Sequence, residues 1–188
     1  SVGSSALCAY LLGVEVSSKL NHAIAQSHYA RGFHPTGTLN TFGATCAAAK
    51  LRRVNVNQFI AAVSVAASLP SGIRQNFGTS AEVFHSGWAA ENGVLAADLA
   101  CRGISGSTDA LEGTAGFFDA YGSGLDPEAI IGKLGKPWVF DSPGVWIKPY
   151  PNGALTHPGA DCLRRIMEEY RLDLSDISNI CVRTNENV

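Results

Sequence analysis

Small and apolar residues recur at helical spacing through the N-terminal half of the chain. Near the start, Leu7, Leu11, Val14 and Leu20 lie among alanines and serines. Later segments combine alanine runs with a basic or glycine ending, which is typical of tightly packed helices with a defined C-terminus. We therefore predict helices over 4–22 and 38–53, from Asn55 or Asn57 to Pro70, and over 87–102.

Glycine, proline and serine interrupt this pattern twice. The segments 29–37 and 71–86 are predicted loops, because glycine and proline cluster in the first, and glycine, serine and threonine dominate the second. Long loops in compact domains tend to be functional. Further along, 109–112 has the spacing of a capping box, and Asp126 before a proline predicts a helix that ends at Gly135.

The pattern changes after that helix. Two short β-prone runs, 138–140 and 145–147, flank a turn, and an amphipathic helix is predicted over 158–170. Residues 179–184 alternate between apolar and polar side chains, as a strand does, with no partner strand after them.

These elements predict a mainly α fold class. An all-helical domain over 1–135 is followed by the start of a smaller α+β domain over 136–188. The first residues already read as the interior of an apolar helix, and the last predicted strand lacks a partner. We therefore expect an internal fragment of a longer protein.

Composition narrows the function classes. The chain has 188 residues, of which 46% are hydrophobic and 16% charged, so it can bury a core. A net charge of -2 argues against nucleic acid or an anionic membrane as partner, and no apolar stretch is long enough to span a bilayer. Five widely spaced cysteines without a CxxC pair favour reduced thiols in the cytoplasm over disulfides or a zinc site.

Three segments carry residue types that chemistry needs, while the usual serine-hydrolase, P-loop, dinucleotide and zinc-protease motifs are absent. In each segment a histidine stands near a predicted helix start, where free backbone N–H groups favour an anion. The segments are Gly32-Phe-His-Pro-Thr-Gly-Thr38, Gly78–Gly87 and Lys148–Pro158.

Each segment also has a purely structural interpretation. His34 either helps to hold a carboxylate or only caps a helix, and His85 has the same two roles open. Lys148, Tyr150 and His157 either converge beside a helix start or lie on a plain surface loop.

In this order, the three segments resemble the MmgE/PrpD family, which includes 2-methylcitrate dehydratase, cis-aconitate decarboxylase and iminodisuccinate epimerase. The resemblance covers nearly the whole chain and is carried by HPTG(T), FGT…HxG, LEGxxGF and KxYPxGxLTHP, together with 92–97. The last motif is most similar to the epimerase branch.

The resemblance implies a helical domain followed by an α+β lid, an active site between them, and no metal or organic cofactor. Family members are usually more than twice as long, so an earlier segment and the rest of the lid would lie outside this sequence. The implied catalytic residues are His85, Lys148, Tyr150 and His157, and the implied substrate-binding residues are His34, Thr36, Thr79 and Glu82.

Within these sets, we assign carboxylate binding to His34, Thr36 and Lys148, and proton transfer to His85 or Tyr150. His157 would orient a partner, and Lys148 is an alternative base if burial lowers its pKa. At the position of Glu82, in the second loop, many family members have a lysine. That change would shift substrate preference, supply a base, or mark an inactive copy.

The implied function is a cofactor-independent lyase of hydro-lyase type that removes a proton next to a carboxylate of a small di- or tricarboxylate. An epimerase is the second hypothesis, because it begins with the same proton abstraction. A non-catalytic helical binding module is the third. The resemblance also implies a homodimeric parent protein, with no nucleic acid or membrane partner.

Overall fold

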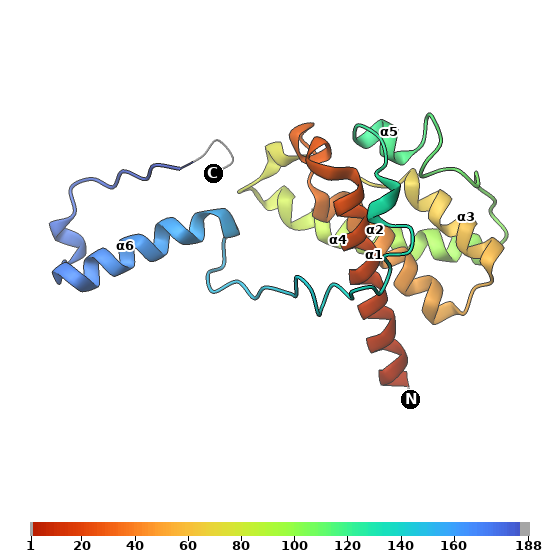
Figure 1. Cartoon of the computed structure of the whole chain (residues 1–188), viewed down its shortest axis with the longest axis horizontal. Coiled ribbons are helices and arrows are strands. Elements are labelled where there is room, and N and C mark those ends of the chain that lie inside the picture. The colour runs from red at the N-terminus through yellow and green to blue at the C-terminus, as the bar shows by residue number, and fades with distance from the viewer. Residues whose placement is uncertain (1, 185–188) are drawn as a thin grey trace. The chain divides into compact units, whose positions relative to one another are not determined.

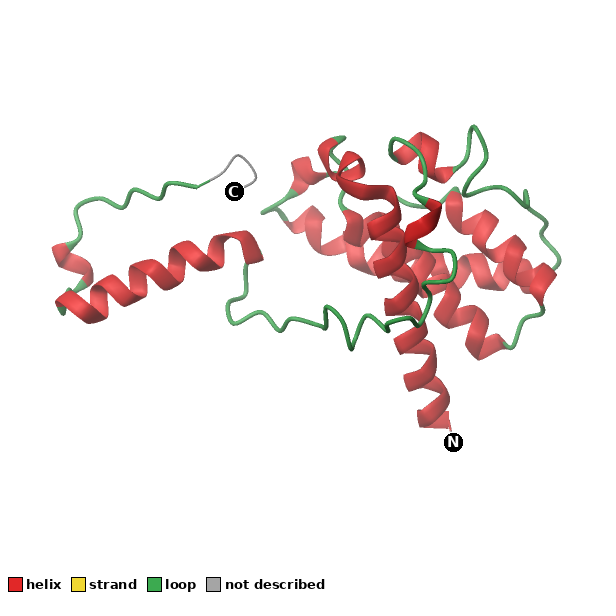
Figure 2. Cartoon of the chain, in the orientation of Figure 1, coloured by secondary structure: helices red, strands yellow, loops and turns green. Residues whose placement is uncertain are grey.

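The computed structural model describes residues 2–184, apart from the side chains of Ala25 and Gln26. These residues form helices, turns and loops, with one isolated antiparallel bridge between Phe33 and Ile73 (Figures 1 and 2). The α-helices are α1 (Val2–Ala30), α2 (Pro35–Arg52), α3 (Val56–Ala67), α4 (Ser80–Cys101), α5 (Phe117–Tyr121) and α6 (His157–Tyr170). Short 3-10 turns are η1 (Arg74–Asn76), η2 (Pro127–Ala129), η3 (Ala154–Thr156) and η4 (Leu174–Asp176).

The chain separates into two compact units, Ser1–Gly144 and Val145–Val188, and each is described by itself. The first unit holds α1 to α5, and it confirms the predicted all-helical domain. The predicted domain limits of 1–135 and 136–188 stay a prediction.

Small residues let the helices of the first unit approach closely, as the alanine-rich pattern predicts. A Cβ at Gly13 would meet the Gly43 carbonyl oxygen at 2.7 Å, and a Cβ at Gly43 would meet the Gly13 oxygen at 2.6 Å. These two glycines bring α1 and α2 into backbone contact. The buried core combines larger residues from α1, α2 and α5 with alanines from α1, α3 and α4: Leu20, Ile24, Leu39, Phe42, Phe117 and Phe118, with Ala23, Ala66 and Ala96.

The start of α3 follows its sequence signal. The Asn55 side chain accepts from the Gln58 N–H at 2.9 Å, while the Gln58 side chain accepts from the Asn55 N–H at 3.0 Å. This reciprocal capping box satisfies two backbone donors that a helix start otherwise leaves without partners. Of the two predicted caps, the structure selects Asn55.

The predicted loop over 71–86 is wrong in its second half, because α4 begins at Ser80 and not at Gly87. Thr79 is the residue before the helix, and its hydroxyl accepts from the Ala81 N–H at 3.2 Å. Glu82 stands three residues later and accepts from the Gly78 N–H at 2.7 Å. Capping by two side chains outweighs the glycine and serine content of this segment.

Two further helix predictions are wrong. Residues 109–112 form turns and start no helix, and α5 begins only at Phe117. Asp126 does cap, accepting from the Glu128 N–H at 3.0 Å, but only the short turn η2 follows. The reason lies in the glycines after it: Gly132 has a φ of +72°, which ends a right-handed helix.

A buried carboxylate on α1 accepts hydrogen bonds from the backbone of the turn-rich segment that follows η2. Glu15 is 1% exposed, and its two oxygens accept from the N–H groups of Gly135 at 2.8 Å and Val139 at 2.7 Å. Lys19 lies 3.8 Å from the same carboxylate and donates to the Pro137 carbonyl at 3.2 Å. Of these backbone groups, the Val139 N–H belongs to the run 138–140, where a strand would have paired it with a neighbour.

The predicted strands at 138–140, 145–147 and 179–184 are wrong for the described residues, which form turns or irregular backbone there. A β-prone run becomes a strand only when another strand supplies hydrogen bonds along its edge, and none of these runs pairs with another. The predicted helix over 158–170 is confirmed as α6, and η3 and η4 flank it in the second unit. No helix among residues 2–184 combines the length and apolar character that a bilayer span requires.

Candidate functional site

His34 lies in the short connection between α1 and α2. Its backbone is held on both sides, because its N–H donates to the Gly72 carbonyl at 3.0 Å and its carbonyl accepts from the Gly37 N–H at 2.9 Å. Pro35 is the first residue of α2. N–H groups in the first turn of a helix have no intrahelical partner, so a proline there costs no hydrogen bond. The His34 side chain makes no capping hydrogen bond, so helix capping does not account for its imidazole.

His85 lies in α4 and packs against two glycines of the first unit. A Cβ at Gly37 would meet His85 Cβ at 3.2 Å, and a Cβ at Gly72 would meet the His85 ring at 3.2 Å. Gly72 also has a φ of +121°, a conformation that residues with a side chain rarely adopt. The absence of side chains at these two positions therefore makes room for His85.

The structure brings His34 and His85 together. Their Nδ1 atoms are 2.8 Å apart, within hydrogen-bond distance, and their ring centroids are separated by 5.1 Å. The Phe77 ring contacts His34 edge-on, with 4.7 Å between centroids. Both histidines are half-buried, so this pair is a defined contact on the helical framework and not a chance meeting of two exposed side chains.

The pair has a restricted set of protonation states. One Nδ1 must carry the shared hydrogen and the other must accept it, so the two Nδ1 atoms cannot both be protonated in this geometry. Burial lowers the pKa of His34, charge on His85 lowers it further, and the Glu82 carboxylate acts in the opposite direction. The neutral form of His34 is therefore favoured at neutral pH.

In the neutral pair, the two outer nitrogens differ. The ring that donates its Nδ1–H has a free lone pair on Nε2, while the ring that accepts carries its own proton on Nε2. The pair thus presents one base and one acid at the same place. General acid–base chemistry needs this combination.

Two of the predicted substrate-binding residues make capping contacts at the start of α4. The Thr79 hydroxyl donates to the Asn76 carbonyl at 2.7 Å and accepts from Ala81, while the Glu82 carboxylate accepts from Gly78. Thr36, from the same predicted set of four, is half-buried in the first turn of α2. Their roles toward a substrate stay predictions.

Of the remaining predicted residues, all in the second unit, Tyr150 and His157 meet and form a cluster with Asp161, while Lys148 contacts its own loop. The Tyr150 hydroxyl donates to the Asp161 carboxylate, and the Tyr150 and His157 rings meet edge-to-face with centroids 5.2 Å apart. Lys148 donates to the Asn152 carbonyl of its own loop at 3.3 Å. Among the described residues, no group hydrogen-bonds His157 Nε2, although solvent does not reach that atom.

The hydrogen bond to Asp161 raises the pKa of Tyr150. A raised pKa keeps the phenol protonated, so it disfavours Tyr150 as a base and leaves its hydroxyl as a hydrogen-bond donor. Asp161 itself was missed by the sequence analysis. Its place four residues after His157, one turn along a predicted helix, is the signal that could have found it.

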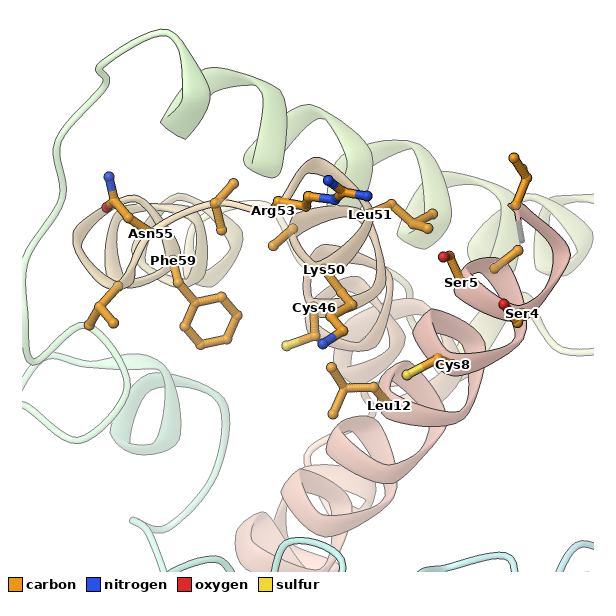
Figure 3. Close-up of a pocket in the computed structure, with 15 residues that line it drawn as sticks. Ser4, Ser5, Cys8, Leu12, Cys46, Lys50, Leu51, Arg53, Asn55 and Phe59 are labelled. Atoms are coloured by element: carbon orange, nitrogen blue, oxygen red, sulfur yellow. The ribbon is translucent and has the colours of Figure 1, made fainter.

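The described residues hold no group of three or more histidine, cysteine, aspartate or glutamate side chains arranged to bind a metal ion. A groove of about 1030 Å³ lies elsewhere in the first unit, between the start of α1, the end of α2 and the start of α3 (Figure 3). Cys46, Lys50 and Phe59 are among its lining residues, and no predicted site residue is. Burial raises the pKa of the Cys46 thiol to about 12, which disfavours a reactive thiolate there.

Comparison with known proteins identifies the family of the chain. The model of the MmgE/PrpD N-terminal domain matches residues 1–130. Cis-aconitate decarboxylase from Homo sapiens is 29% identical over 160 residues, which is 85% of this chain and 33% of that protein. The Mus musculus cis-aconitate decarboxylase has the same identity and coverage, so the chain spans about a third of the length of the curated relatives it matches. Because the family model covers 130 of the 188 residues, the chain belongs to the MmgE/PrpD family.

Proposed function

We propose that this chain carries part of the active site of a lyase that acts on a small di- or tricarboxylate by proton transfer next to a carboxylate. The observation that carries the proposal is the 2.8 Å contact between the Nδ1 atoms of His34 and His85. The relatives support the reaction class, because cis-aconitate decarboxylase is by its name a lyase of a tricarboxylate. The finer proposal is a hydro-lyase, with a homodimeric parent in the cytoplasm.

The pair can pass a proton from one side of a substrate to another. The free Nε2 of one ring takes the proton beside the carboxylate, which makes that ring an imidazolium. Its Nδ1 proton then moves to the Nδ1 of the second ring, whose Nε2–H becomes acidic and delivers a proton to the leaving hydroxyl. The C–H and C–O bonds break, a C=C bond forms, water leaves, and the pair returns to its neutral form in the opposite tautomer.

Local electrostatics suits this sequence. A neutral His34 is available as a base or acceptor, because burial and His85 lower its pKa. Glu82 opposes that shift and so stabilises the single positive charge that the pair carries during the transfer. Lys148, Tyr150 and His157 are proposed contributors from the second unit, with Tyr150 as a hydrogen-bond donor whose raised pKa keeps it protonated.

An epimerase is the second candidate, favoured by the same pair. Epimerisation takes a proton from one face of a carbon and returns one to the other, and two rings with opposite Nε2 states supply both groups. No leaving group is then needed.

The test is proton exchange followed by NMR in D₂O. The protein is expressed from its complete reading frame and incubated with cis-aconitate, 2-methylcitrate, citrate, malate and iminodisuccinate. His85→Gln is the variant, and His22→Gln is the matched control because His22 is exposed on α1.

Deuterium at an α-carbon that is lost in His85→Gln and kept in His22→Gln supports the proposal. Loss of water or CO₂ then identifies a lyase, and an inverted centre identifies an epimerase. Binding of a carboxylate without exchange or turnover contradicts the proposal and favours a binding module.

A further inference from the structure

A third histidine is buried beside the pair, and the proposed reaction does not use it. His28 lies near the end of α1 and is 1% exposed. Its Nδ1 is 2.8 Å from the Tyr121 carbonyl oxygen in α5, and its Nε2 is 2.7 Å from the Thr38 hydroxyl in α2. One ring thus links three helices behind the connection that holds His34.

Its partners fix the tautomer of this ring. A carbonyl oxygen only accepts, so His28 Nδ1 carries the hydrogen. Burial lowers the pKa of His28, while the hydrogen bond to Tyr121 opposes the shift, so the neutral ring is favoured. The lone pair on Nε2 then accepts from the Thr38 hydroxyl, which is fully buried.

Two contacts connect this ring to His34. The Thr38 hydroxyl gives its one hydrogen to His28, while the Thr38 backbone N–H donates to the His34 carbonyl oxygen at 3.1 Å, so Thr38 connects His28 to the His34 backbone. The Phe33 ring, from the residue before His34, stacks on His28 with 4.9 Å between centroids and an angle of 8°. Phe33, directly before His34, and Thr38, one helical turn after it, thus both contact the one buried imidazole of His28.

We propose that His28 is a positioning residue: through Thr38 and Phe33 it sets the backbone of His34, and so the contact between the His34 and His85 rings. Its effect on catalysis rests on the proposed function, but its effect on the histidine pair does not. Reacting groups need placement within a fraction of an ångström, so a small shift of His34 is costly to the chemistry.

The test reads the histidine pair directly, by ¹⁵N NMR of the imidazole nitrogens in the 188-residue chain. Thr38→Val removes the hydroxyl with little change of shape. Thr45→Val is the matched control, because Thr45 is also fully buried in α2 but its hydroxyl donates only to the Thr41 carbonyl, at 2.8 Å. His28→Gln is the second variant, and it keeps a donor and an acceptor at this position.

In the wild type we expect one Nδ1 of the pair to be protonated and the other not. Thr38→Val should move the His34 and His85 nitrogen shifts, and Thr45→Val should leave both unchanged. His28→Gln should give shifts between those of the wild type and Thr38→Val. A pair that responds equally to Thr38→Val and Thr45→Val overturns the proposal. So does a pair that is unchanged in both His28→Gln and Thr38→Val.

A second readout separates this proposal from the proposed function. In protein from the complete reading frame, Thr38→Val should lower kcat about 10- to 100-fold with KM nearly unchanged, because alignment and not binding is lost. A shift of the NMR signals in a protein that turns over no carboxylate would refute the function and retain the positioning role. An unchanged kcat beside unchanged signals would refute the positioning role alone.

Discussion

The histidine pair of the first unit and the Tyr150–His157 cluster of the second are built in different ways. His34 and His85 stand on backbone that is fixed by hydrogen bonds, by two glycines and by the buried ring of His28. Tyr150 and His157 are held by their own side-chain contacts and by Asp161, on α6, which has no buried residue.

This difference separates a preorganised part of the proposed site from one that depends on local contacts. A catalytic group on a packed framework keeps its geometry without substrate, because moving it would disturb many buried neighbours. A group held by exposed contacts can move more easily, because few buried neighbours are disturbed when it does. Substitutions in the core of the first unit should therefore change its stability and the geometry of the histidine pair. In the second unit, the position of Tyr150 and His157 should change mainly when residues of the cluster itself are substituted.

The largest expected effect is on catalysis. His34→Gln and His85→Gln should each lower kcat about 10²- to 10⁴-fold, because each removes half of the proton relay. The double variant should be little worse than either single one, since the two residues act as a unit. The measurement is kcat for the carboxylate that exchanges deuterium.

His22→Gln is the control for this cycle, and it should retain wild-type kcat. Strictly additive losses in the double variant would show that the rings work independently, and the shared-proton mechanism would then be wrong.

Core packing gives the next largest effect. Phe118→Ala should lower the free energy of unfolding by about 3–5 kcal/mol, because this ring is 1% exposed among Phe117 and Phe42. Ile166→Ala in α6 should cost less than about 1 kcal/mol, since Ile166 is 48% exposed. Urea unfolding of the chain compares the two, and equal losses would refute the contrast between the units.

A smaller effect tests the room made for His85. Gly72→Ala should cost about 1–3 kcal/mol, because its φ of +121° strains any side chain and the new Cβ would meet the His85 ring. Gly78→Ala is the control: its φ is +77°, but nothing lies within 4 Å of a Cβ there. Both should lose stability, while only Gly72→Ala should change the His34 and His85 nitrogen signals.

The sequence predicted the helical framework well because its signals are local. Alanine and glycine runs indicated close helix packing, and Asn55 with Gln58 indicated a helix start, each within a few residues. The early start of α4 also has a local signal, in Thr79 and Glu82, but the glycine and serine content of the segment favoured a loop prediction.

The site was harder to predict, because its contacts join distant positions. His34 and His85 are 51 residues apart, and only the resemblance to a family put them together. Nothing in the pattern around His28 shows that its ring reaches Thr38 and Tyr121, since an isolated histidine in a helix is consistent with many environments. The strand predictions failed for the same reason, because pairing depends on partners outside the run.

The smallest expected effect is on the pH dependence of stability. Burial lowers the pKa of His28 and of His34 below the ordinary histidine value of 6.5, so the folded chain binds fewer protons than the unfolded chain in this range. The free energy of unfolding should therefore fall as the pH decreases below 6.5 through the folded pKa values, and this contribution should be fully present above 6.5.

His28→Gln isolates the share of one ring, because glutamine does not titrate. Carboxylates also lose stabilising charge in acid, but they do so equally in the variant and the wild type, so the difference between the two curves belongs to His28. That difference should shrink as the pH falls, because the wild type must protonate a buried ring. Urea midpoints between about pH 5 and pH 7 supply both curves. If the His28→Gln and wild-type curves run parallel, the buried ring does not resist protonation, and the neutral tautomer that links Tyr121 to Thr38 is not the one that stabilises the fold.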